Sequence, residues 1–159
     1  MPHTDQHLED LLATHADVLR PLLGPLWPPV PFKTEQFGPL TKYTLGQMPD
    51  GTWAMLHRIG GPDTSPPHDH PTRLDSYGID GSYWETIFHD DGRTERVLRA
   101  AGGNHTIWPH TVHSITDLPQ GVAWTLAFGH EVVRAWKHYP ELAEPHSKYH
   151  TASGLAYSG

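Results

Sequence analysis

The chain has 159 residues, a length that fits one domain with a sizeable core. It carries 11 Lys and Arg against 18 Asp and Glu, a formal net charge of −7, and it has no cysteine. Disulfides, thiolate metal sites and cysteine nucleophiles are therefore excluded, and so acidic a chain is a poor nucleic-acid binder. No apolar run approaches the roughly 20 residues of a membrane helix, and the acids in residues 1–20 are unlike a signal peptide. We expect a cytoplasmic protein with no nucleic-acid or membrane partner.

The N-terminus is predicted to form one amphipathic helix. Leucines recur at helical spacing over residues 8–23, and Thr4 or Asp5 can cap the first turn. Pro21 has no amide hydrogen, so the regular helix is expected to end near the residue before it. Residues 24–31 (GPLWPPVP) then form a Pro-rich connector.

After about residue 38, short runs of β-branched and aromatic residues alternate with turn clusters. Asp90-Asp91-Gly92 and Asp50-Gly51 are typical of hairpin turns. Strands are expected near residues 39–46, 52–59, 73–79, 82–89, 93–99, 104–108, 111–116 and 122–129. This rhythm predicts an all-β sandwich or barrel. We expect one domain overall, with the helix and connector at 1–31, the barrel at 32–140 and a surface tail at 141–159.

Three of the 14 histidines stand out by their context. His68 and His70 lie in PPHDHP, and residues two apart in an extended segment point to the same face. His113 follows in PHTVHSI, where a hairpin-rich barrel can bring it beside the first pair. Three neutral imidazoles suit Fe, Ni, Cu, Zn or Co and leave coordination positions open, as catalytic sites do. Because the chain has so many histidines, the alternative to a metal site is that these are surface or core-edge histidines whose spacing arose by chance.

The sequence around these histidines resembles the cupin superfamily over about residues 40–136. The positions that match its two motifs are Gly61, His68, His70, Gly81, Gly103, Pro109 and His113. The chain looks closest to small single-domain bacterial cupins with an HDHP motif, a GxYxE stretch and a late Trp-Thr-Leu strand. The resemblance implies a cupin (jelly-roll) β-barrel with the N-terminal helix packed outside. It says little about substrate, because cupins host many chemistries.

The chain is similar, more loosely, to thiol dioxygenases of the cysteine dioxygenase type. It shares their HDH pair, the GxxxETxF stretch from Gly81 to Phe88 and the separate third histidine. Those enzymes bind ferrous iron through three histidines and oxidise a thiol to a sulfinate. Two features depart from their pattern. A chain without cysteine cannot form their cysteine–tyrosine crosslink, and their Ser-His-Tyr relay would fall near Trp124, Leu126 and Phe128, which cannot carry protons.

Further residues are candidates for metal or substrate contacts. Asp75 falls near the cupin glutamate position, where it can bind the metal as a fourth ligand, orient a histidine or pair with Arg73. Arg58 and Arg73 are candidates for gripping a substrate carboxylate. Trp108 and Trp124 lie near the metal-motif strands and are expected to line the substrate pocket.

Three residues are candidates for catalytic roles. Glu85 can act as a general base or orient a metal ligand, and Tyr83 shares its face of the strand by alternation, although the pattern leaves the direction of that face open. His110 lies three residues before His113 and is expected to line the pocket. A structural salt bridge is the alternative role for Glu85, with Arg58, Arg96 or Arg99 as its partner.

These patterns lead to a metal-dependent cupin oxygenase as the expected function. The substrate would be a small polar molecule, such as cysteine or another thiol or amino acid, used together with dioxygen. Fe(II) is the expected metal, with Ni(II), Co(II), Mn(II) or Zn(II) as alternatives. The competing readings are a non-redox cupin enzyme (an isomerase, cyclase or lyase) and a small-ligand-binding cupin. Because edge strands need covering, we also expect a homodimer.

Overall fold

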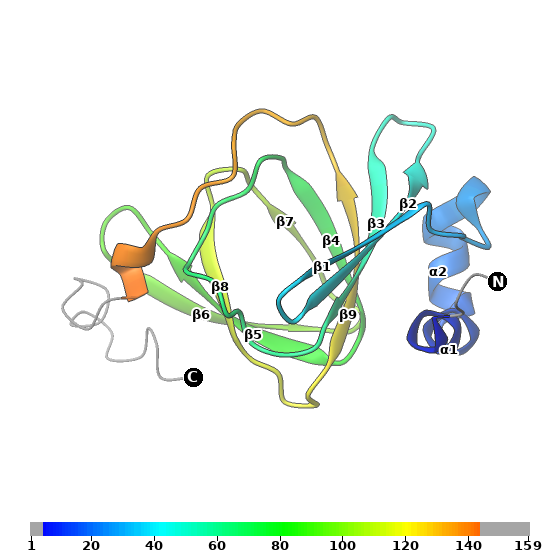
Figure 1. The fold of residues 1–159 in the computed structure, drawn as a ribbon, viewed down its shortest axis with the longest axis horizontal. Coiled ribbons are helices and arrows are strands. Elements are labelled where there is room, and N and C mark those ends of the chain that lie inside the picture. Colours follow the sequence, from blue (N-terminus) through cyan, green and yellow to red (C-terminus); the bar gives the residue numbers. More distant parts are fainter. Residues whose placement is uncertain (1–4, 144–159) are drawn as a thin grey trace.

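The structure is a computed structural model that describes residues 5–143. Its strands are β1 (Lys33–Phe37), β2 (Leu40–Gln47), β3 (Trp53–Ile59), β4 (Leu74–Asp80), β5 (Ser82–Phe88), β6 (Thr94–Ala100), β7 (Asn104–Ile107), β8 (Val112–Asp117) and β9 (Ala123–Gly129). All pairs are antiparallel, in a six-stranded sheet ordered β1-β2-β3-β9-β4-β7 and a three-stranded sheet ordered β6-β5-β8. Figure 1 shows the two sheets curving toward each other. The all-β jelly-roll prediction is confirmed, although the strand ladders leave two sheets rather than one closed barrel.

The N-terminal helices cover the outer face of the larger sheet. They are α1 (Gln6–Thr14) and α2 (Ala16–Leu23), and a short 3₁₀ helix, η1 (Gly24–Leu26), follows them. Leucines of both helices share one core with Tyr43, Leu56 and Trp124 of the sheet. Alternation along β9 then turns Thr125 toward the smaller sheet. The predicted position of the helical segment outside the sheets is therefore confirmed (Figure 1).

The helical segment differs from its sequence prediction in one respect. The helix breaks at His15 and resumes as α2, which runs through Pro21 to Leu23 instead of ending before the proline. A proline inside a helix removes one hydrogen bond. Here the fully buried side chains of Leu19 and Leu23, on either side of Pro21, pack against the sheet and offset that loss. At the start of α1, the Asp5 carboxylate accepts the Leu8 amide at 3.1 Å as the expected cap.

Strand β1 was not expected from the sequence. Its residues KTEQF are mostly polar and exposed, so they carry no strand-like apolar alternation. It pairs with β2 at the edge of the larger sheet, where Glu35 lies opposite Lys42. Charged residues are common on edge strands because they discourage further pairing.

The two predicted hairpin turns are present, and part of the predicted C-terminal tail is described. Gly51 and Gly92 adopt φ of 92° and 89° in the turns before β3 and β6, as the hairpin signals predict. A second 3₁₀ helix, η2 (Pro140–Ala143), ends the described part, so most of the expected tail at 141–159 lies outside it. Within residues 5–143, no helix is both long and apolar enough to cross a membrane. The division at residues 31 and 140 stays a prediction.

The packing of α2 yields a stability prediction. Leu19→Ala should lower the free energy of unfolding by about 2–5 kcal/mol, because it leaves a cavity between the helix and the sheet. Val18→Ala is the matched control, since Val18 on the same helix is 47% exposed and should change stability little. Urea unfolding of both variants measures the difference. Equal losses would contradict the packing described here.

His57 yields a prediction about pH. It lies on the inner face of β3 opposite Thr125, and burial, aided by Lys42, lowers its pKa to about 4. The unfolded chain therefore takes up a proton at this site as pH falls from about 6.5 to 4, while the folded protein does not, so stability is lost across that window. At pH 5, protonation of His57 in the unfolded chain lowers the free energy of unfolding by about 2 kcal/mol. Unfolding of metal-free His57→Gln should show a correspondingly weaker pH dependence than the parent chain, and an unchanged one would contradict it.

Candidate metal centre

Three histidines from two segments converge between the sheets. His68 and His70 lie on the loop between β3 and β4, and His113 lies on β8. The backbone amides of His68 and His113 each donate to the other's carbonyl, at 3.1 and 3.0 Å, which aligns the loop with the strand. One ring nitrogen from each of the three histidines lies within 4.8 Å of the other two. The structure thus brings together all three residues that the motifs singled out.

Each histidine is oriented so that a nitrogen is available to the cluster. Nε2 of His70 and Nε2 of His113 are 3.1 Å apart. His68 Nδ1 lies 3.3 Å from the Pro66 carbonyl, so a hydrogen on Nδ1 leaves the Nε2 lone pair free. Burial, reinforced by His113, lowers the pKa of His68 to about 4 and that of His70 to about 2. Both rings are therefore neutral at physiological pH, the state in which imidazole binds metals.

Glu85 holds the third histidine. It is 1% exposed and points inward from β5, which settles the direction that alternation left open. Its Oε2 lies 3.5 Å from His113 Nδ1, and its Oε1 lies 3.3 Å from a terminal guanidinium nitrogen of Arg99 on β6. Burial alone would raise the pKa of Glu85, but His113 and Arg99 outweigh it and lower the pKa to about 2. An ionised carboxylate behind a histidine fixes the ring and makes it a stronger ligand.

Asp69, between the first two histidines, faces the other way and fastens the segment that follows β9. Its side chain is fully buried and accepts the Lys137 amide at 2.9 Å and the Tyr139 hydroxyl at 3.0 Å. Arg134 adds an ion pair at 2.9 Å. We call residues 130–139 the strap, which crosses from β9 to the loop that carries the histidines (Figure 1).

Aromatic rings lie on the strap side of the cluster. The Trp136 ring lies edge-on to the His68 ring, with 5.6 Å between the ring centres. It stacks on the His138 ring, with 5.4 Å between the centres. Trp136 also lies edge-on to Phe37, with 6.3 Å between the ring centres, so the tip of the β1–β2 hairpin reaches the strap. Trp136 is 46% exposed, which places the cluster beneath a partly open aromatic cover.

The structure places Asp75 away from the histidine cluster. Asp75 lies opposite Phe128 of β9, on the outer face of the sheet. Its carboxylate binds His130 at 2.7 Å and Thr106 at 3.1 Å and pairs with Arg73 at 3.2 Å. Of the three roles considered for Asp75, the ion pair with Arg73 is present, and the histidine that Asp75 contacts is His130, which is not one of the clustered three.

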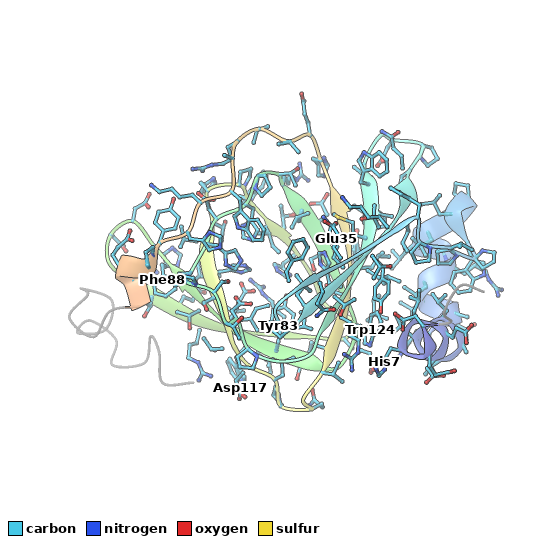
Figure 2. All side chains as sticks on the ribbon, viewed as in Figure 1. His7, Glu35, Tyr83, Phe88, Asp117 and Trp124 are labelled. Carbon is cyan, nitrogen blue, oxygen red and sulfur yellow. The ribbon has the colours of Figure 1, made fainter. Side chains whose placement is uncertain are left out.

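The candidate substrate residues also lie outside the cluster. Arg58 is opposite Trp124 on the outer face, and the Trp124 ring stacks on Tyr43 at 5.8 Å in the core beneath the helices. Figure 2 shows Trp124 on the helix side of β9 and Tyr83 in the space between the sheets. The Arg73 guanidinium lies 5.0 Å from the centre of the Trp108 ring, which is 47% exposed.

His110, the third catalytic candidate, is exposed on the turn before β8. Of the catalytic and substrate candidates, Tyr83 and Glu85 are the two that point between the sheets. The sequence interpretation missed Asp69, Trp136 and His105, which lies on β7 opposite the inward Ser76. The sequence does indicate that Asp69 points away from the metal ligands, because it lies between two histidines that share a face. Trp136 follows the late Trp-Thr-Leu strand of the cupin resemblance, but its place beside His68 depends on the path of an irregular segment, which the sequence does not predict.

Comparisons with known proteins support the fold. No protein-family model matches the chain, and a comparison with curated proteins found no match. Among solved structures, it is similar to the polyketide cyclase RemF from Streptomyces resistomycificus, at 20% identity and a TM-score of 0.51, over 79% of this chain and 90% of that one. A Bacillus subtilis oxalate decarboxylase variant matches at 16% identity and a TM-score of 0.53, over 77% of this chain. Hydroxypropylphosphonic acid epoxidase from S. wedmorenis matches at 11% identity and a TM-score of 0.51, over 64% of it.

These neighbours share the cupin fold, so the chain has that fold as expected. The chain spans 34% of the decarboxylase and 57% of the epoxidase, and the three proteins carry out different reactions. Similarity at this level shows the fold and leaves the chemistry to the site itself.

The contact between Glu85 and His113 yields a prediction for metal affinity. Glu85→Gln should weaken divalent-metal binding by about 10–100-fold, because the neutral amide no longer makes the His113 ring a strong ligand. Competition titration with a chromophoric chelator measures the affinity. Glu9→Gln removes the same charge from the exposed face of α1 and should bind metal as the parent chain does. Equal affinity in all three proteins would show that Glu85 does not support the site.

Proposed function

We propose that the protein is a metal-dependent oxygenase of the cupin fold that acts on a small polar substrate at His68, His70 and His113. The observation that carries this proposal is the convergence of three buried imidazole nitrogens within 4.8 Å. Three neutral donors satisfy a divalent ion only in part, so coordination positions remain for a substrate. The cupin neighbours with an epoxidase, decarboxylase or cyclase name support an enzyme in general.

Fe(II) is the ion we propose, and when bound it would supply oxygen activation and Lewis acidity. The chain's own contribution is positional. Glu85 holds the His113 ring, the Pro66 carbonyl holds His68, and the strap fastened by Asp69 limits access of water from one side. The three imidazoles bring no negative charge, so the site favours a substrate that chelates through an anionic group such as a thiolate or carboxylate. Cysteine and other thiols or amino acids fit this description.

A non-redox enzyme is the second candidate, and the inner face of β5 favours it. Glu85 and Tyr83 both point between the sheets, so an ionised carboxylate and a phenol lie on the same face as His113. Such groups suit proton transfers in an isomerisation, cyclisation or lyase reaction with the metal as a Lewis acid. The similarity to a polyketide cyclase along most of both chains agrees with this alternative.

The metal site is tested by removing its ligands. We expect one divalent ion per chain, and His68→Ala, His70→Ala and His113→Ala should each lose most of it while the fold is kept, because helix and sheet packing does not involve these side chains. Elemental analysis of anaerobically purified protein measures occupancy, and circular dichroism checks the fold. His110→Ala is the matched control on the exposed turn. Full occupancy in the triple variant would refute the assignment.

The reaction class is tested with oxygen. Fe(II)-loaded protein should consume dioxygen with at least one member of a panel of thiols and amino acids, and anaerobic addition of a chelating thiol should produce a thiolate-to-metal charge-transfer band. The His68→Ala variant should do neither. A metal-loaded protein that consumes no oxygen with any member of the panel would reject the oxygenase and leave the Lewis-acid enzyme as the better candidate.

A further inference from the structure

A second polar site lies between the sheets, at the end opposite the three histidines. It is a cavity of about 200 Å³ bounded by parts of β4, β5, β6, β7 and β9. Its polar lining includes Ser76, Tyr83, Arg99, Asn104, His105 and Thr125. Neither Glu85 nor any of the three clustered histidines lines it. The cavity therefore lies next to the Glu85–Arg99 ion pair, with Arg99 on its wall.

Glycines let the chain close around this cavity. A Cβ atom on Gly78 would collide with the Ala100 carbonyl, and one on Gly81 would collide with the Val122 carbonyl. Gly81 also has φ of 70°, which disfavours any other residue. The β4 and β5 ends thus approach neighbouring backbone closely on two sides, which fixes the shape of this end of the cavity.

Two residues that line the cavity, Arg99 and His105, each have a buried nitrogen without a hydrogen-bond partner. Arg99 uses one terminal nitrogen for Glu85, but its Nε is buried and has no hydrogen-bond partner in the structure. His105 Nε2 is also buried and unpartnered. Burial, reinforced by Arg99, lowers the pKa of His105 to about 4, so its ring is neutral at physiological pH and can present an N–H at Nε2. An unsatisfied buried donor is costly, so an acceptor that reaches these two nitrogens would bind favourably.

We propose that this cavity binds a small monocarboxylate between Arg99 and His105. A guanidinium edge and a neighbouring N–H match the two oxygens of a carboxylate. The volume is below the roughly 300 Å³ at which drug-sized ligand pockets begin, so the ligand has only a few carbon atoms. Asp80 also lines the cavity and Glu85 already pairs with Arg99, so a single negative charge is favoured over a phosphate dianion.

The experiment uses the full chain after its metal has been removed, so that an anion cannot bind to a metal ion instead. Acetate, propionate and inorganic phosphate are titrated by calorimetry, and the His105 ring nitrogens are followed by NMR. We expect saturable acetate or propionate binding that shifts the His105 signals, and weaker or no binding of phosphate. No saturable carboxylate binding, or tighter binding of phosphate, would overturn the proposal. Because no metal is present, neither result bears on the proposed oxygenase.

Substitutions locate the binding. Arg99→Lys keeps the charge beside Glu85 but loses the Nε–H, and His105→Phe removes the second donor; each should weaken carboxylate binding at least tenfold. Arg96→Lys is the control, because the Arg96 guanidinium lies 4.5 Å from the centre of the Trp84 ring on the outer face of the same strand pair. Circular dichroism checks that all three variants fold. Unchanged affinity in both cavity variants would overturn the assignment.

Discussion

The candidate metal centre depends on one backbone pairing. His68 and His113 exchange two hydrogen bonds, at 3.1 and 3.0 Å, and this pairing fastens an irregular loop to the regular strand β8. A paired extended segment must alternate its side chains, so His68 and His70 turn toward His113 while Asp69 turns to the opposite side, beneath the strap. Two of the three metal donors and Asp69, which fastens the strap, therefore come from three consecutive residues. A slip of one residue in this pairing would exchange their faces and remove both features.

Two charged side chains, Glu85 and Arg99, lie behind His113 because alternation along β5 and β6 turns both of them inward. The inner face of β5 presents Glu85 toward His113, and β6 supplies Arg99 on the other side of that carboxylate. The buried glutamate therefore has a cation at one oxygen and a histidine at the other, which compensates for its desolvation. The interior is divided by this pair into a histidine end and an arginine end, and each end has polar groups suited to a different kind of ligand.

Sequence reasoning succeeded where local periodicity decides the structure and failed where tertiary contacts decide it. The strands from β2 to β9 and the HxH pair follow from alternation, turn glycines and same-face geometry. Strand β1 was missed because a polar edge strand has no apolar alternation, and the path of α2 through Pro21 depends on packing against the sheet. Asp75 was a candidate because it falls near the cupin glutamate position, and Arg58 because a guanidinium can grip a carboxylate. Their register with β9 puts both on the outer face, which no single strand reveals.

The strap sets an order on how the finished site comes into being during translation. Asp69 is separated from its partners Lys137 and Tyr139 by 68 and 70 residues, so its carboxylate has no such partners until residues 137–139 have left the ribosome. The three histidines, by contrast, need only the strands of the two sheets, and the last of these, β9, ends at Gly129, before the strap begins. A nascent chain can therefore assemble the metal donors before it can cover them. The donors are open to the surrounding solution during that interval, which is when a metal ion meets the least obstruction on its way in.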